Sequence, residues 1–514
     1  MRVAARGAAP PRIDIAAWTV DKDSDGYDIR FLAQAPLAIT SPSRRNLVIA
    51  LGRISRPIDA ANQTYAIAFS RDDGETKWET PVANPVADSN AGITVDPEHD
   101  TVIVCSGNKV TALRLYDGEV VWQRQLSRDI IDANPVITND LGPADRLFIT
   151  DADGLGSTAK LYCINVDECD SVLNPFQPGE IVWSAPLGAS VGNSPAYLPA
   201  CQGGAGLVYV ASPAPGGYGN GVVRAFVAAD NSPNLAWQTA NPEPISFFGG
   251  VSVAPPTDTD PAPRVYVASY AFIGNLNSAN LLSLNGLDGS VVWSVASNRS
   301  SSVPMPLPDR RVLLSSGING YGSASGVELF QETSTESQTS VARVWNTVVS
   351  TWIDLDGDGE IDLGEFLSLG GWRHQPALLT ADGRNLLVVG VPAESLDLNG
   401  PGDGLYILDI DKGPSSEDFI VACSSATAAG GSPGIAGVSM ASIGSDGLAM
   451  FGATPARLDV NRNKTRTIDD LYVWEAGFGD RDVNRDHVTN EEDRRTLIRS
   501  LRPTWPQLNF GVLP

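Results

Sequence analysis

The stretch that decides the fold is VTALRLYDGEVVW, residues 110–122, in which an apolar run leads into an Asp-Gly turn and then a short segment that ends in tryptophan. The same order occurs in YAIAFSRDDGETKW, residues 65–78, and in LLSLNGLDGSVVW, residues 281–293. Alternating apolar residues on both sides of an Asp-Gly pair are typical of two antiparallel strands joined by a tight turn. The sequence therefore predicts a series of β-hairpins that each end in tryptophan.

This hairpin is one half of a longer repeat. The tryptophans of the series are Trp78, Trp122, Trp183, Trp237, Trp293 and Trp345. Two further segments with strand-like alternation precede a hairpin, for example ITVDPEHDTVIVCSG at residues 93–107. Four short strands in about 50 residues form one blade of a β-propeller. A ring of blades also explains how one domain in a chain of 514 residues avoids a single large core.

Two incomplete repeats predict how the ring closes. A seventh repeat at residues 385–425 lacks the tryptophan, and a final half-repeat at residues 437–453 has inner strands only. Near the N-terminus, IAAWTV supplies a spare strand that contains Trp18. Pairing this strand with the half-repeat gives an eighth blade, and closure removes sheet edges that would otherwise invite aggregation. We therefore expect an all-β, eight-bladed β-propeller over residues 12–454, closed by the N-terminal strand.

The order of apolar run, Asp-Gly turn and tryptophan resembles the PQQ-like (quinoprotein-type) β-propeller repeat. The resemblance covers roughly residues 15–454. It implies eight blades in which each tryptophan docks against the neighbouring blade. Because the tryptophan recurs at a fixed point of the repeat, we expect it to serve packing, whereas a ligand site would need only one.

The sharpest motif is DLDGDGEIDLGE, residues 354–365, which matches the twelve-residue EF-hand calcium loop at each diagnostic position. Its candidate calcium ligands are Asp354, Asp356, Asp358, Glu360 through its carbonyl, Asp362 and Glu365. Gly359 permits the sharp bend, and carboxylates this close repel one another without a cation. Gly370 and Gly371 leave no room for a long helix after the loop. We expect a structural calcium clamp over residues 350–371, inserted between blades six and seven; the alternative is an acidic surface turn.

A second acidic loop, DKDSDGYD at residues 21–28, has the first half of the same pattern. Its candidate calcium ligands are Asp21, Asp23 and Asp25, while Leu32 occupies the position of the closing carboxylate. The loop resembles the calcium loops of FG-GAP repeats. The alternative interpretation is an ordinary Asp-rich turn.

A duplicated motif follows the propeller. The segments DVNRN and DVNRD, at residues 459–463 and 482–486, resemble the loops of a type I dockerin within residues 455–514. The candidate calcium ligands are Asp459, Asn461, Asn463, Asp470, Asp482, Asn484, Asp486 and Asp493. Both loops lack the sixth-position glycine, so a degenerate helical tail packed on the propeller is the alternative. The resemblance implies a short α-helical calcium-loop tail, a cohesin-like protein partner and polysaccharide-degrading assemblies.

Charge limits the classes of partner. The formal net charge is −24, from 60 acidic and 36 basic residues, which disfavours nucleic acid and anionic membranes and suits hard cations. No apolar run is long enough to span a bilayer, and the first residues lack the apolar stretch of a signal peptide. Calcium loops of modest affinity fill at about 10⁻³ M, the extracellular range, so we expect an extracellular or cell-surface protein.

One pattern indicates a binding face. Predicted inner strands begin with a polar residue shortly before Pro or Gly, and these candidate ligand-binding residues are Asn90, Asn134, Asn193 and His374. In a closed ring such openings converge on one mouth of the central channel. The alternative is simple turn chemistry at the start of each strand.

No motif for catalysis stands out. The chain has three histidines, and we find no nucleophile elbow, HExxH motif or P-loop. The enzymatic alternatives are a PQQ-dependent dehydrogenase and a calcium-dependent polysaccharide lyase; the resembling dehydrogenases carry adjacent cysteines at the cofactor, and this chain has none. We therefore expect a non-enzymatic, calcium-stabilised binding or scaffolding module, monomeric in its propeller, that recognises a protein or a carbohydrate.

Overall fold

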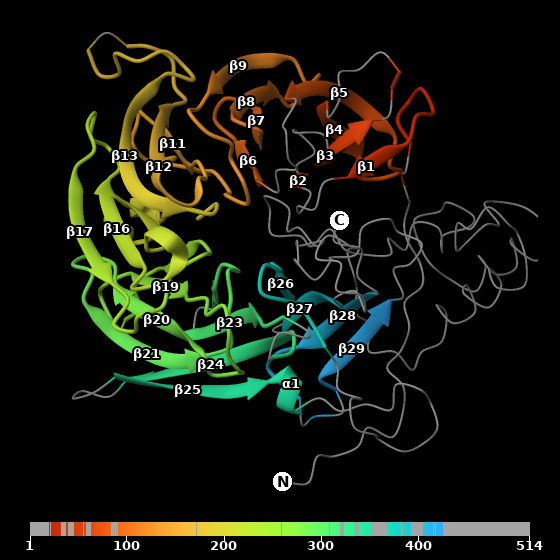
Figure 1. The fold of residues 1–514 in the computed structure, drawn as a ribbon. Coiled ribbons are helices and arrows are strands. Elements are labelled where there is room, and N and C mark those ends of the chain that lie inside the picture. The colour runs from red at the N-terminus through yellow and green to blue at the C-terminus, as the bar shows by residue number, and fades with distance from the viewer. Residues whose placement is uncertain are drawn as a thin grey trace, which may run out of the picture.

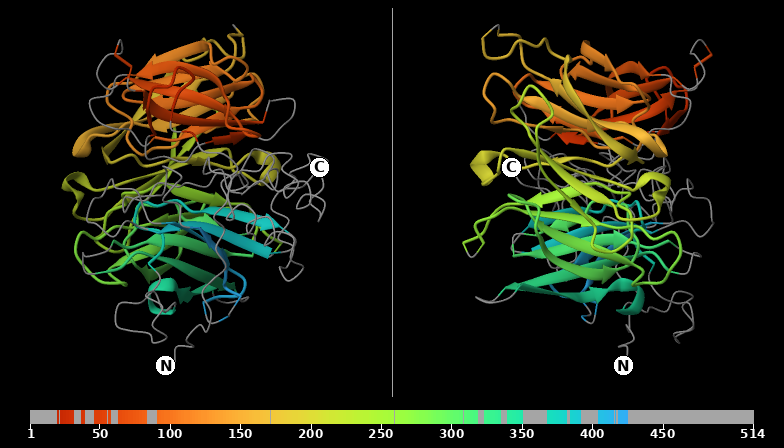
Figure 2. Two further views of the ribbon diagram at one scale, coloured as in Figure 1. Left: turned by 90° about the vertical axis from the view of Figure 1, so that its right-hand side faces the viewer. Right: turned by 60° about the vertical axis from the view of Figure 1, so that its left-hand side comes forward.

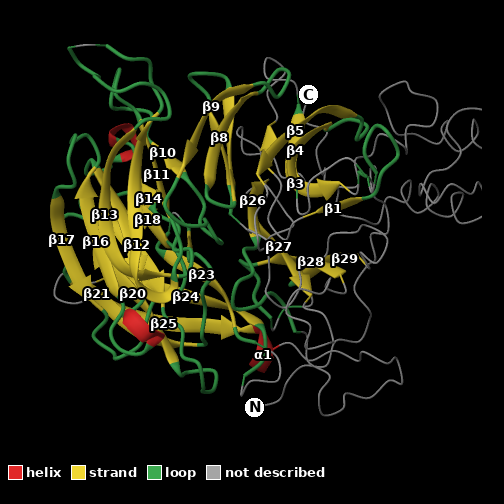
Figure 3. Cartoon of the chain, turned by 45° about the horizontal axis from the view of Figure 1, so that its top comes forward, coloured by secondary structure: helices red, strands yellow, loops and turns green. Residues whose placement is uncertain are grey.

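The structure is a computed structural model that describes parts of residues 20–424. The described residues are 20, 22–31, 37–39, 46–54, 56–57, 63–83, 91–170, 172–258, 260–307, 309–318, 323–334, 339–350, 368–381, 384–391, 404–414, 416 and 418–424. Strands dominate this part of the chain, and helix is confined to short segments (Figure 3). Among the described residues, no helix is long and apolar enough to cross a membrane.

The strands form seven antiparallel sheets. The first sheet contains β1 (Ile29–Phe31), β2 (Leu37–Ile39), β3 (Leu47–Ile54), β4 (Thr64–Ser70) and β5 (Thr76–Ala83). The second contains β6 (Ile93–Asp96), β7 (Thr101–Ser106), β8 (Lys109–Arg114) and β9 (Val120–Gln125), and the third contains β10 (Val136–Ile137), β11 (Arg146–Thr150), β12 (Gly154–Asn165) and β13 (Ile181–Ser190). The fourth contains β14 (Ala196–Tyr197), β15 (Leu207–Ser212), β16 (Val222–Val227) and β17 (Leu235–Ala240).

The remaining sheets follow the same plan. The fifth contains β18 (Val251–Ala254), β19 (Arg264–Ala268), β20 (Ala279–Asn285) and β21 (Val291–Ser297), and the sixth contains β22 (Met305–Pro306), β23 (Arg311–Ser316), β24 (Gly326–Ser334) and β25 (Thr339–Asn346). The seventh contains β26 (Ala377–Ala381), β27 (Arg384–Val391), β28 (Gly404–Asp409) and β29 (Ile420–Ser424). The short helical segments are η2 (Ala200–Gln202), η3 (Pro215–Gly217) and α1 (Thr347–Ser350).

The sheets are the blades of a β-propeller. In each, sequential strands pair in order, and in the first sheet β1 and β2 share the same edge of β3, with Ile29 opposite Ile54 and Leu37 opposite Ile49. The blades succeed one another around a common centre, with first strands such as β6 and β26 inside and last strands such as β17 and β25 outside (Figure 1). Two further views show the blades as packed, twisted sheets (Figure 2). The all-β propeller expected from the sequence is confirmed.

The core lies between neighbouring blades rather than at one centre. Between blades one and two, Leu51 and Trp78 pack with Val102 and Leu113, and equivalent layers separate every later pair of described blades. Each fully buried side chain of this size contributes about 1.5–3 kcal/mol. Stability therefore accumulates blade by blade.

The repeated tryptophans hold these layers together. Trp78 lies on β5, and its indole Nε1 donates a hydrogen bond to the carbonyl oxygen of Leu115 in blade two, 3.0 Å away. Trp237 makes the same kind of bond, 3.0 Å long, to Gly286 in blade five. All six tryptophans of the series lie on the outermost strand of their blade, and their packing role agrees with the expectation.

Parts of the sequence prediction lie outside the described residues. Trp18 and residues 437–453, on which the eighth blade depends, are not described, nor are residues 455–514. The side of the first blade that faces away from blade two carries the buried residues Ile67 and Phe69. In a closed ring, this is the side that an eighth blade would cover. The calcium-loop residues 354–365 are also not described; in the sequence they lie between β25 and β26.

Candidate functional site

One face of the propeller is built from the segments that lead into the first strand of each blade, here called the mouth loops. Neighbouring mouth loops are joined by hydrogen bonds. Gly92 N–H donates to the Ala133 carbonyl oxygen over 3.1 Å, and Asn134 N–H donates to Ser194 Oγ over 2.9 Å. The side-chain hydroxyl of Ser302 donates to the His374 carbonyl oxygen over 2.7 Å. The described starts of the inner strands therefore converge on one mouth, as the sequence predicts.

The predicted ligand-binding side chains take different roles in this ring. Asn193 is buried, and its Nδ2 donates to the carbonyl oxygens of Phe247 and Gly249, 3.1 and 2.7 Å away. His374 is also buried, and the Gly390 N–H donates to its Nε2 over 3.2 Å. Both side chains are thus held by backbone groups. Asn134 is exposed at the mouth, and Asn90 lies outside the described residues.

An ion pair joins opposite sides of the mouth. Arg373 in the mouth loop of blade seven contacts Asp132 in the mouth loop of blade three, four blades away. The Arg373 guanidinium also lies over the ring of Trp372, 5.3 Å from its centroid. Asp132 has φ of 60°, a left-handed conformation that is strained for a residue with a side chain. The backbone therefore holds an acidic side chain toward the arginine from the far side of the ring.

Aromatic rings lead outward from this ion pair to the rim of the same face. The Trp372 and Tyr270 centroids are 5.1 Å apart, those of Tyr270 and Phe272 are 5.5 Å apart, and those of Phe272 and Tyr218 are 5.3 Å apart. Phe248 packs edge-on against both Tyr270 and Phe272. Such offset and edge-to-face contacts add about 0.5–1.5 kcal/mol per pair to burial. The rings form one connected cluster across blades four, five and seven.

The sequence interpretation missed this cluster. Its members sit in loops beside glycine, in GGYGNG (216–221), FFGG (247–250), SYAFIG (269–274) and GGWRH (370–374). The first of these joins β15 to β16. Aromatic residues near glycine in several loops of the repeat were the available signal.

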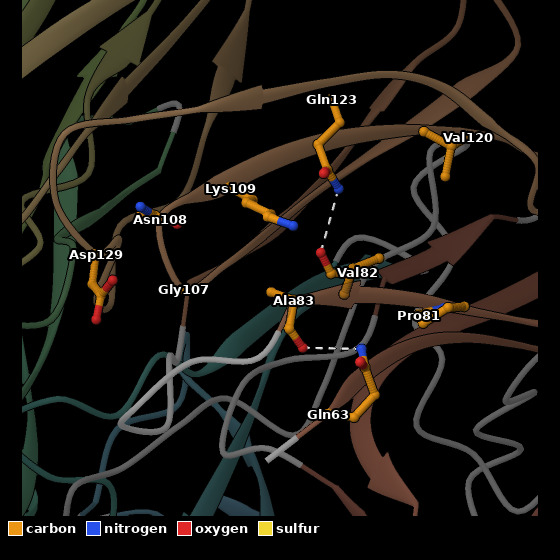
Figure 4. Close-up of a pocket in the computed structure, with 10 residues that line it drawn as sticks. All are labelled: Gln63, Pro81, Val82, Ala83, Gly107, Asn108, Lys109, Val120, Gln123 and Asp129. Atoms are coloured by element: carbon orange, nitrogen blue, oxygen red, sulfur yellow. Dashed lines mark hydrogen bonds between the residues drawn. The ribbon is translucent and has the colours of Figure 1, made fainter. Parts of the chain in front are cut away.

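A pocket of about 600 Å³ lies on the same face between blades one and two (Figure 4). Its polar lining includes Lys109, Asp129, Gln63 and Gln123. The two glutamine amides donate to the carbonyl oxygens of neighbouring blade-one residues, as the dashed lines show. The described lining residues are mostly polar or small, so the pocket offers a place for a small polar molecule.

In the described part of the N-terminal acidic loop, donors within the protein engage the Asp23 carboxylate. Asp23 Oδ1 accepts hydrogen bonds from the N–H groups of Asp25 and Tyr27, 3.0 and 2.7 Å away, and Oδ2 accepts one from Arg56 Nε at 2.9 Å. Burial would raise the pKa of Asp23, but the Tyr27 N–H and Arg56 outweigh it and lower the pKa. Asp21 is outside the described residues, and within the described ones no three His, Cys, Asp or Glu side chains group as metal ligands do.

One buried carboxyl group lies near the mouth. Asp151 is fully buried, and it accepts hydrogen bonds from Tyr162 Oη at 2.9 Å, from the Lys160 N–H at 2.7 Å and from Ser127 Oγ at 3.3 Å. Burial raises the pKa of Asp151 despite these donors. The carboxyl group is fully enclosed, and its hydrogen bonds link β11 to β12 and to the mouth loop of blade three.

Comparisons with known proteins agree on the fold. The family model described as outer membrane protein assembly factor BamB matches residues 39–168. No curated protein matches the chain. The solved structure of a europium-containing methanol dehydrogenase is similar with a TM-score of 0.50 and 10% identity, covering 85% of this chain and 83% of that one.

Two further solved structures are more distant in shape. A quinohemoprotein alcohol dehydrogenase from Pseudomonas putida HK5 has a TM-score of 0.49 and 10% identity, covering 86% of this chain and 73% of that one. BamB from Moraxella catarrhalis has a TM-score of 0.37 and 13% identity, covering 74% of this chain and 94% of that one. The family match and the methanol dehydrogenase structure together show that this chain has a PQQ-like repeat fold.

Proposed function

We propose that the chain is a non-enzymatic binding or scaffolding module that recognises its partner on the mouth face of the propeller. The observation that carries the proposal is the make-up of that face. Its centre is bridged by Arg373 and Asp132, and its rim displays aromatic rings rather than a nucleophile with a base. A fold shared with dehydrogenases does not by itself supply their chemistry.

The main alternative is a PQQ-dependent dehydrogenase, which the chemistry of the described residues disfavours. At the mouth, the charges of Arg373 and Asp132 are paired with each other. Cys105 and Cys163 are buried, and burial raises the pKa of both thiols, so they are poor nucleophiles. No two cysteines are adjacent in the sequence. We assign no step of a reaction to this site.

A protein is the preferred kind of partner. The matching family model describes an assembly factor, which is a protein-binding role. The two enzymatic alternatives, a dehydrogenase and a polysaccharide lyase, both require a reactive site, which turnover assays can detect. A carbohydrate ligand and a cohesin-like partner for residues 455–514 remain proposals that rest on the sequence.

Calcium stabilisation and export are further parts of the proposal. The support for calcium is the twelve-residue motif from Asp354 to Glu365, which is outside the described residues. Such a loop fills at extracellular calcium concentrations of about 10⁻³ M, which supports an extracellular or cell-surface location.

A paired assay tests the proposed function. The full chain is incubated with PQQ and calcium, and reduction of a redox dye by methanol, ethanol or glucose is followed; a parallel assay follows the ultraviolet absorbance of unsaturated sugars released from acidic polysaccharides. We expect neither signal, together with a melting temperature that rises when calcium is added. Turnover in either assay would overturn the non-enzymatic proposal.

A further inference from the structure

An apolar patch is exposed beside the mouth and is built by three consecutive blades. We call it the rim patch: Leu155 of blade three, Tyr218 of blade four, and Phe272 and Ile273 of blade five. Ile273 is 90% exposed, Tyr218 77%, Leu155 39% and Phe272 38%. Isolated exposed apolar residues are normal on a protein surface, but contiguous groups mark interaction sites.

The four side chains are contiguous. Gly217 lies between two of them, since a Cβ atom at this glycine would be 3.0 Å from Leu155 Cδ2 and 3.2 Å from Phe272 Cε2. Tyr218 stacks on Phe272 with ring centroids 5.3 Å apart. Ile273 follows Phe272 directly in the loop between β19 and β20. The patch is therefore one surface and not four scattered residues.

Buried polar contacts hold the patch in its exposed position. Arg299 is fully buried, and its guanidinium donates to the carbonyl oxygens of Phe272 and Gly274, 2.8 and 2.9 Å away. The loop that carries Tyr218 is fixed by the Ala214 N–H, which donates to Ser246 Oγ over 3.1 Å. Because these contacts fix both loops before a partner binds, the loops lose little conformational entropy on binding.

The chemistry beside the patch favours a protein over a sugar. Asn220 Nδ2 donates to the carbonyl oxygens of Asn241 and Glu243, and Arg343 Nη1 donates to Asn277 Oδ1. These side chains are therefore engaged within the protein, whereas sugar recognition needs donors and acceptors turned to the ligand. Leu155 and Ile273 are aliphatic and give no flat face for a sugar ring.

The net charge of the chain indicates a second property of the partner. None of the four patch residues is charged, yet the chain as a whole carries −24. A field of this sign raises the association rate of a positively charged partner, while the uncharged patch supplies apolar contact. We propose that the rim patch docks an apolar segment of a partner protein that is flanked by basic residues. This inference rests on the proposed binding function and names the surface and the partner's chemistry.

The test uses the full chain and a library of fluorescein-labelled twelve-residue peptides. Every peptide has lysines at both ends, and the central positions vary over Leu, Ile, Phe, Tyr and Trp; a matched peptide has a Ser-Gly centre and the same charge. We expect fluorescence anisotropy to show binding that depends on the apolar centre. The substitutions Ile273→Asp and Tyr218→Ser should each weaken it at least about tenfold, which equals about 1.4 kcal/mol.

The matched control is Val172→Asp. Val172 is 83% exposed in the connection between β12 and β13, at the opposite ends of the strands from the rim patch, so binding should not change. Circular dichroism and melting temperature check that each variant is folded. The inference fails if no peptide binds in a centre-dependent way, if Ile273→Asp binds normally, or if oligosaccharides such as cellohexaose compete for the site. These outcomes leave the dye-reduction and lyase assays unaffected, so failure of the inference and failure of the proposed function are separable.

Discussion

Gly118 shows how a single residue enables the contact between two blades. It has φ of 72°, and a Cβ atom there would lie 2.5 Å from the six-membered ring of Trp78. Gly179 and Gly289 face Trp122 and Trp237 in the same way. The Asp-Gly turn thus has two physical roles, since glycine supplies the left-handed turn and also leaves space for the indole. The sequence pattern predicted the turn, but only the structure reveals the second role.

Substitution of this glycine separates the two roles. Gly118→Ala should destabilise the protein by about 2–4 kcal/mol, because the left-handed strain of about 1 kcal/mol adds to overpacking against Trp78 of about 1–3 kcal/mol. Gly142→Ala is the matched control, since Gly142 has φ of 66° and open space around its Cβ position, so only the strain applies. Urea unfolding measures both. Equal losses in the two variants would contradict the packing role.

Residue-scale prediction was less successful at the mouth. Asn193 and His374 were expected to face a ligand because they precede inner strands, yet burial and backbone partners give them a structural role. Single-sequence patterns locate a loop without showing which side chains turn inward. The exposed rings of Tyr218 and Phe272 lie in irregular loops, where no periodicity reports orientation.

At the scale of elements, turns on the face opposite the mouth connect blades two and three. His99, between β6 and β7, lies with Nδ1 2.8 Å from Asp96 Oδ2 and Nε2 3.4 Å from Asp167 Oδ1, and Asp167 follows β12 in the next blade. Burial would lower the pKa of His99, but the hydrogen bond and charge of Asp96 and the charge of Asp167 outweigh it and raise the pKa, with Glu98 adding to them. Asp96 is the stronger partner, because it shares a hydrogen bond with His99 and lies closer than Asp167.

The raised pKa predicts a pH-dependent contact between the blades. Charged His99 is favoured in the folded state, so its contribution is fully present below the unfolded histidine pKa of about 6.5 and is lost as the pH rises through the folded value. His99→Gln should therefore reduce stability more at pH 5.5 than at pH 8. Thermal unfolding at the two pH values measures this, with NMR titration of His99 as the control. A wild-type and variant difference that is the same at both pH values would contradict it.

At the scale of the whole molecule, the first blade carries a turn of the same kind as the Gly118 turn. Gly74 has φ of 74°, and its N–H donates to the Ser70 carbonyl oxygen over 2.9 Å. In the same way, the Gly118 N–H donates to the Arg114 carbonyl oxygen over 2.8 Å. In blades two, three, five and seven, a glycine of such a turn lies against the tryptophan of the preceding blade. The sequence predicts that Trp18 belongs to the blade that precedes the first one, although Trp18 itself is outside the described residues.

This arrangement predicts that ring closure depends on Trp18 as the other junctions depend on their tryptophans. Trp18→Ala and Trp78→Ala should each cost about 3–5 kcal/mol of unfolding free energy, since both delete an indole from a junction between blades. Gly74→Ala should produce a loss similar to that of Gly118→Ala, but in the Trp18→Ala background it should cost only the left-handed strain of about 1 kcal/mol, because the overpacking against the indole is gone. Chemical unfolding of the single and double variants measures the coupling. If Trp18→Ala is neutral while Trp78→Ala is not, the N-terminal strand does not close the propeller, because an indole that completes the ring must be as costly to remove as one within it.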